Sequence, residues 1–197
     1  MESRDSPRTS LLILGAGLLA GLALGLLIFF GVPALEGGGL PRLSLPGGPT
    51  ATPAPAPVVG APAPDFTLVD LAGNAVALSG LRGRPILINF WATWCGQCRV
   101  EMPAIEQRWQ RYQSQGLVVL AVDAGEPAAV VQDFVTAYGL TFTVLLDPDF
   151  RVNDLYRVRG YPTSYFVDRA GIVQALQIGS LTERQLDDYL ARIGLTG

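Results

Sequence analysis

One segment limits the possible folds of this chain more than any other: an apolar strand followed at once by two closely spaced cysteines. The run "PILINFWA", Pro85 to Ala92, is apolar almost throughout and rich in β-branched and aromatic residues. Such a run is typical of a strand buried on both faces. Cys95 and Cys98, the two cysteines among 197 residues, follow it and open a predicted helix. A C-x-x-C pair between a buried strand and a helix favours redox chemistry on an α/β fold.

Two other uses of the cysteine pair fit the sequence poorly. A structural disulfide that closes so short a loop removes little entropy from the unfolded chain, so it would stabilise the fold weakly. A zinc site needs further Cys or His ligands, and the chain has no other cysteine and no histidine. Because Arg99 rather than His follows Cys98, covalent haem attachment is excluded as well. We therefore expect a redox pair and no metal or other cofactor.

The position of each cysteine predicts its part in the reaction. Cys95 lies at the helix N-terminus, where unpaired N–H groups and the helix dipole favour the thiolate. The thiolate is the nucleophile, and this placement lowers its pKa from about 8.5. Cys98 lies one turn further on, where it can resolve a mixed disulfide. We therefore expect Cys95 to attack and Cys98 to release the product.

The rest of the globular part alternates strands with helices, which indicates a mixed α/β sandwich around one sheet. Two short strands joined around Gly73-Asn74 are expected first. The predicted strands that follow are 85–92, 117–124, 141–147 and a hairpin turning at 169–171, and the predicted helices are 95–115, 127–138, 151–157 and 182–193.

The N-terminal third has a different composition. Residues 11–30 are uninterrupted apolar or small residues, about the length that a helix needs to cross a bilayer, and we expect a retained signal anchor. A cleaved signal peptide is the alternative, although its apolar core is shorter. Because Arg4 and Arg8 precede the segment, residues 1–10 are predicted to be cytoplasmic and the rest extracytoplasmic. Residues 31–64 are rich in Pro, Gly and Ala and are predicted to be a linker, with one domain at 65–197.

Several motifs together resemble the thioredoxin superfamily. "ILINFWATWCGQC" is similar to its strand–WC-x-x-C–helix segment, and "GYPTSYFVDRAGIV", Gly160 to Val173, resembles its proline loop and the hairpin after it. The anchor, the two leading strands and "NFWATWC" are similar to the membrane-anchored TlpA/ResA-like thiol–disulfide oxidoreductases of the redoxin (AhpC/TSA) group. This resemblance covers nearly all of residues 65–197. It implies a thioredoxin-like fold with an N-terminal β-hairpin extension and a β-α insertion at about 117–146.

The resemblance also implies roles for residues beside the cysteines. Pro162 matches the superfamily's cis-proline, and Tyr161 before it is expected to offer backbone hydrogen bonds to an extended substrate. Trp94 is expected to form part of the docking surface. Glu101 fits where TlpA/ResA-like proteins place a carboxylate, while Asn89 replaces the buried aspartate of thioredoxin itself. A carboxylate near the pair would raise the thiol pKa values and could carry the proton of Cys98.

The resemblance implies a membrane-tethered reductant outside the cytoplasm. A transmembrane thiol donor of the CcdA/DsbD kind would supply its electrons, and a protein disulfide, such as that of apocytochrome c or a copper-site protein, would receive them. Gln97 stands where many relatives have proline, which leaves a disulfide oxidant or isomerase open. A thiol peroxidase and a copper-delivery or assembly factor are further alternatives. The net charge of −3 makes nucleic acid an unexpected partner.

Overall fold

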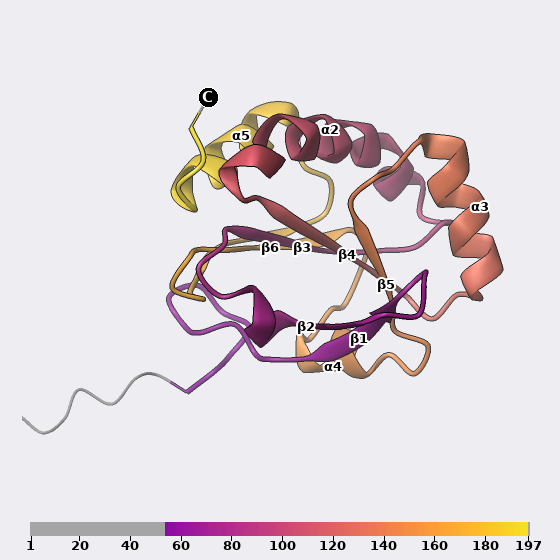
Figure 1. Cartoon of the computed structure of the whole chain (residues 1–197), viewed down its shortest axis with the longest axis horizontal. Helices are drawn as coiled ribbons and strands as arrows, with labels where there is room; N and C mark the ends of the chain where they lie inside the picture. The colour runs from indigo at the N-terminus through magenta and orange to yellow at the C-terminus, as the bar shows by residue number, and fades with distance from the viewer. Residues whose placement is uncertain (1–53, 197) are drawn as a thin grey trace, which may run out of the picture. The chain divides into compact units, whose positions relative to one another are not determined.

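The computed structural model describes residues 54–196, which fold around one seven-stranded sheet in the order β2-β1-β5-β4-β3-β6-β7 (Figure 1). At its centre lie three parallel strands, β3 (Ile86–Trp91), β4 (Val118–Asp123) and β5 (Thr143–Leu146). Every residue of β3 and β4 is buried. The prediction that these two apolar runs form strands buried on both faces is therefore confirmed.

Antiparallel strands extend the parallel centre on both sides. The hairpin of β1 (Thr67–Asp70) and β2 (Ala75–Ala77) pairs with β5 through β1, as the predicted N-terminal hairpin extension requires. On the other side, β6 (Thr163–Val167) pairs with β3, and β7 (Val173–Ile178) forms the second predicted hairpin. The Asp70 carboxylate closes the first turn by accepting hydrogen bonds from the backbone of Ala72 and Asn74.

Four helices connect or close the strands: α2 (Gly96–Tyr112), α3 (Ala128–Tyr138), α4 (Arg151–Leu155) and α5 (Glu183–Arg192). The predicted helix 95–115 is shorter in the structure, because α2 gives way to a 3₁₀ turn at Gln113–Gln115 and then to Gly116 with φ of +97°. Thr182 and Gln185 form a reciprocal capping box at the start of α5, where this helix was predicted to begin.

The sheet separates two apolar layers because successive side chains of a strand point to opposite faces. One layer packs Leu87 and Trp91 of β3 against α2, α3 and α5. The other packs Ile88 and Phe90 against α4 and the N-terminal hairpin. Figure 1 shows α2 and α5 on one side of the sheet and α4 on the other. The C-terminal end of β3 and the first turn of α2 thus lie at the edge of a rigid core.

Contacts with the domain begin upstream of Asp65, inside the range predicted as linker. The backbone of Gly60 donates to Val173, Val173 donates to Ala61, and Ala63 donates to Gly171. Residues 56–63 therefore lie along the start of β7. Within residues 54–196, no helix is long and apolar enough to cross a membrane. The predicted anchor at 11–30 and the N-terminal part of the linker lie outside the described residues.

Candidate active site

The two cysteines form a disulfide at the first turn of α2. Their sulfur atoms are 2.16 Å apart and their Cα atoms 5.3 Å. Cys95 is the N-cap residue of the helix, and its sulfur accepts a hydrogen bond of 3.1 Å from the backbone N–H of Cys98. Cys98 is completely buried, whereas Cys95 retains 7% of its surface. The sulfur of the less buried cysteine thus accepts from a helix N–H group, an arrangement that stabilises a thiolate there once the bond is reduced.

Glu101 lies on the same face of α2 as Cys98 and is 3% exposed, so it is not a solvated surface acid. One carboxylate oxygen accepts a hydrogen bond of 2.9 Å from the Asn89 amide of β3, and the other accepts 2.9 Å from the Leu181 N–H before α5. Burial raises the pKa of Glu101 to about 6, against the lowering effect of the Leu181 and Asn89 hydrogen bonds. The side chain can therefore take up or release a proton near neutral pH.

The Asn89 amide links Glu101 to β6. It also donates a hydrogen bond of 2.9 Å to the hydroxyl of Ser164, two residues after Pro162. The side chain is completely buried, and its Oδ1 atom has no protein partner. Asn89 thus fixes the Glu101 carboxylate relative to both α2 and the strand that follows the proline loop.

The peptide bond between Tyr161 and Pro162 is cis, as the resemblance implied. The Tyr161 ring packs edge-on against Trp94, with ring centroids 5.8 Å apart, and its hydroxyl donates 2.8 Å to Asn153 of α4. Asn153 is itself held by Asp147, which accepts from its side chain and its backbone N–H. The proline loop is therefore braced by α4.

An open groove of about 580 Å³ runs past Cys95. Trp94, which is 66% exposed, and Tyr161 are among the residues that line it, together with Gly96, Gln97 and Val158–Gly160. Cys95 and the proline-loop residues Gly160 and Tyr161 thus border the same groove. Trp94, Tyr161 and Cys95 thus lie together, as the sequence predicted.

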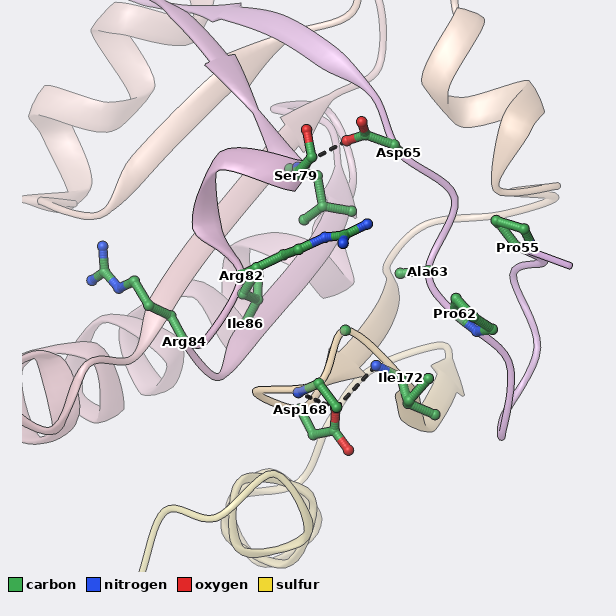
Figure 2. A pocket seen from close by; sticks show the side chains of 13 residues that line it. Pro55, Pro62, Ala63, Asp65, Ser79, Arg82, Arg84, Ile86, Asp168 and Ile172 are labelled. Carbon is green, nitrogen blue, oxygen red and sulfur yellow. Dashed lines mark hydrogen bonds between the residues drawn. The ribbon is translucent and has the colours of Figure 1, made fainter. Parts of the chain in front are cut away.

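A separate cavity of about 220 Å³ lies at the other end of the sheet (Figure 2). Its lining comes from the N-terminal segment, the 3₁₀ turn Leu78–Leu81, the start of β3 and the turn between β6 and β7. In Figure 2, Arg82 reaches across the cavity toward Ala63, and Asp65 accepts a hydrogen bond from the backbone of Ser79. Because Cys95 follows the opposite end of β3, this cavity is not part of the redox site.

Other residues of the site gave no signal in the sequence. Ser164 and the Leu181 backbone contact site residues that are far away in the chain, and Asn153 contacts Tyr161 across the segment that joins α4 to β6. Glu126, in the loop after β4, accepts from both the N–H and the hydroxyl of Thr93. Each of these contacts exists only after the strands have assembled, and no short motif encodes it.

Comparison with known proteins agrees with this geometry. Residues 59–176 match the model of the AhpC/TSA family. Thiol-disulfide oxidoreductase ResA of Geobacillus kaustophilus is 38% identical over 135 residues, which cover 68% of this chain and 78% of that protein. ResA of Bacillus subtilis is 37% identical over 131 residues, covering 66% and 73%.

Solved structures show the same fold. A protein of Chlorobium tepidum, provisionally assigned as thiol:disulfide interchange protein DsbE, superposes with a TM-score of 0.63 at 34% identity, over 68% of this chain and 96% of that one. A provisional protein disulfide isomerase of Bacteroides thetaiotaomicron gives 0.64 at 31% identity, over 69% and 87%. This chain therefore belongs to the AhpC/TSA family, as a thiol–disulfide oxidoreductase of the ResA/TlpA-like kind.

Proposed function

We propose that the protein is a membrane-tethered extracytoplasmic reductant that passes electrons from Cys95 and Cys98 to disulfides of specific proteins. The observation that carries this direction is the buried carboxyl group of Glu101, one helical turn after Cys98. An anionic carboxylate close to the pair disfavours the thiolate and so raises the thiol pKa values. A dithiol whose thiolate is not stabilised gives up its electrons more readily, in contrast to strong oxidants, whose reduced form is stabilised.

The chemistry requires two exchange steps. The Cys95 thiolate attacks one sulfur of the client disulfide, forming a mixed disulfide and releasing the other client sulfur as a thiolate. Cys98 then loses its proton, for which Glu101 is the suitable acceptor, and attacks the Cys95 sulfur. The client leaves with two thiols, and the Cys95–Cys98 disulfide reforms with the two electrons transferred. A dithiol donor must then reduce this disulfide before another cycle.

The groove supports a protein rather than a small molecule as client. It is open, and Trp94 and Tyr161, whose aromatic rings pack edge-on, line it together with Cys95. An extended segment that pairs with the backbone at Tyr161 would bring its disulfide to Cys95. The haem-binding cysteines of an apocytochrome c, or the cysteines of a copper-site protein, are the proposed clients.

The N-terminal segment supports the proposed location. Residues 11–30 have the length and composition of a membrane span, with the basic residues Arg4 and Arg8 before it. We infer a single-pass protein of the cell membrane with its N-terminus in the cytoplasm. A transmembrane thiol donor of the CcdA/DsbD kind would then supply electrons from the cytoplasmic side.

The experiment that tests the direction is a redox equilibrium of the full chain in detergent against glutathione or dithiothreitol, followed by thiol trapping. We expect a midpoint at or below that of thioredoxin, about −270 mV. A midpoint near −120 mV, the range of the strong periplasmic oxidant, would contradict a reductant and favour the oxidant. Rapid oxidation of Cys95 by peroxide, or tight stoichiometric copper binding by the reduced protein, would favour the other two alternatives.

A further inference from the structure

Two acidic residues, Asp123 and Glu126, are linked to each other and to the turn that carries Cys95. Asp123 is the last residue of β4 and is completely buried. Its Oδ2 atom accepts a hydrogen bond of 2.7 Å from the backbone N–H of Glu126, but its Oδ1 atom has no donor. An ionised carboxylate with an unpaired buried oxygen is costly, so this side chain requires an explanation.

Glu126 connects this buried group to the nucleophile. Its two carboxylate oxygens accept hydrogen bonds of 2.5 Å from the N–H and the hydroxyl of Thr93. Thr93 lies in the turn between β3 and α2, and the backbone of Cys95 donates to Ala92 in the same turn. Because both of its oxygens act as acceptors, Glu126 is best suited to this task when it is ionised.

Within the described part of the chain, neither Asp123 nor Glu126 forms a salt bridge. The two salt bridges identified among residues 54–196 both belong to Arg108, on the distant part of α2. Arg99 of α2 lies over the Phe134 ring of α3. The ionisable groups on the neighbouring elements include Asp147 after β5, Asp154 of α4 and Tyr161 on the proline loop, besides the cysteines themselves. A buried carboxyl group next to a half-buried carboxylate, with an ion pair to neither, favours keeping one proton on the pair.

We propose that Asp123 is a neutral carboxylic acid in the working protein, that its proton is donated to the Glu126 carboxylate, and that this acid pair positions the turn carrying Cys95. The proton gives Oδ1 the partner that it otherwise lacks and leaves Glu126 anionic to hold Thr93. Asp123 is thus a positioning residue that acts through Glu126. The inference holds for either direction of electron flow, because it concerns the geometry of the nucleophile.

The pair makes the site sensitive to pH. Burial, with a further contribution from the charge of Glu126, raises the pKa of Asp123 to about 7. Above that pH, Asp123 gains a negative charge directly against Glu126, and the hold on Thr93 weakens. The charge of Asp123 also acts on the proline loop. The pKa of the Tyr161 hydroxyl is raised mainly by the burial of Tyr161 and further by the negative charge of Asp123. A second negative charge in this region also disfavours the Cys95 thiolate.

Asp123→Asn tests the proposal, because asparagine can donate to Glu126 but cannot ionise. The measurement is the alkylation rate of Cys95 in the reduced full chain, in detergent, from pH 5.5 to 9. In the wild type, we expect the plot of alkylation rate against pH to show a second inflection near pH 7, besides the one from the titration of Cys95. Above this pH, the rate should be several-fold lower than the rate calculated from the Cys95 titration alone. Asp123→Asn should remove that inflection. Asp133→Asn, the same change at an exposed position of α3, should keep it.

Asp123→Leu separates donation from mere loss of charge. Leucine is neutral but has no donor, so we expect a slower reaction of Cys95 throughout the pH range. An Asp123→Asn profile that matches the wild type, or an Asp123→Leu rate equal to that of Asp123→Asn, would overturn the proposal.

If the Asp123 variants do not fold, the protonation of Asp123 can be measured directly in the wild-type protein. With aspartate labelled at the carboxyl carbon with ¹³C, one aspartate signal should titrate near pH 7. Replacement of Glu126 by Gln should move that titration downward. If every aspartate carboxyl of the folded wild type titrates in the ordinary range, near pH 4, Asp123 is not a neutral acid at neutral pH and the proposal fails.

Discussion

At the scale of single residues, Glu101 differs most from an ordinary helix acid, because its carboxyl is enclosed by α2, β3 and the segment before α5. With a pKa of about 6, it is largely ionised at neutral pH. We expect Glu101→Gln to lower the pKa values of the reduced cysteines and to increase the thiolate fraction at pH 7. Thiolate absorbance and alkylation against pH measure this shift. Glu183→Gln, which removes the same charge from the surface of α5, is the control. An unchanged thiol profile in Glu101→Gln would exclude the proposed role.

Glu101 also predicts a pH dependence of stability. Its pKa is raised from 4.5 to about 6 on folding, so the folded state binds the proton more tightly than the unfolded chain. The contribution is full below pH 4.5 and is lost as the pH rises through about 6. The shift corresponds to about 2 kcal/mol. Urea unfolding of the oxidised protein should therefore show that the wild type loses about this much more free energy of unfolding than Glu101→Gln between pH 4.5 and 7. Parallel curves would contradict the assignment.

At the scale of elements, the short helix α4 supports the docking groove. Asp147 holds its first turn by accepting from the N–H groups of Val152 and Asn153, and Asn153 accepts from the Tyr161 hydroxyl. A helix of five residues has little stability of its own, so these side-chain bonds keep it in place. The groove thus depends on a chain of contacts that begins outside it.

Asn153→Ala should loosen the proline loop without touching the cysteines. We expect a higher KM for a disulfide-bonded peptide client and little change in the reduction of a small disulfide such as oxidised glutathione. Tyr161→Phe removes only the hydroxyl and should act in the same direction. Both changes break the same hydrogen bond, the one between Tyr161 and Asn153. The KM of the double variant should therefore be no higher than that of Asn153→Ala alone. Additive effects would mean that the two residues act separately.

Most helices and strands could be predicted from the sequence, but the side-chain hydrogen bonds that hold the site in place could not. The apolar runs of β3 and β4 fix the centre of the sheet, and the C-x-x-C spacing fixes the start of α2. The contact of Glu126 with Thr93 joins two loops whose proximity follows only from the assembled sheet, and the contact of Asn153 with Tyr161 depends on how α4 packs against the proline loop. The packing of residues 56–63 on β7 was also missed, since backbone hydrogen bonds leave no mark on composition.

At the scale of the whole molecule, the chain enters the domain far from the redox site. Residues 56–63 pair with the start of β7, at the end of the sheet where β3 begins, whereas Cys95 follows the other end of β3 (Figure 1). The groove beside Cys95 therefore lies at the opposite end of β3 from the segment through which the chain enters the domain.

The proposed membrane tether leads to a prediction about its length. Deleting residues 36–53 should slow the reduction of a client held in the same membrane or nanodisc, because a tether too short to span the distance between the two sites prevents their encounter. The reduction of a soluble peptide by the same variant should keep its rate, which provides the internal control. Equal rates on the membrane-held client would show that the length of this segment does not limit the encounter.

The two edge strands of the sheet, β2 and β7, affect how the protein behaves in concentrated solution. β2, at one edge, has only three residues, and the start of β7, at the other, is covered by residues 56–63. Exposed edge strands are templates on which further chains add by backbone pairing, and short or covered edges remove that opportunity. Both edges of the sheet thus offer a shortened template, which lowers the tendency of the domain to aggregate edge to edge.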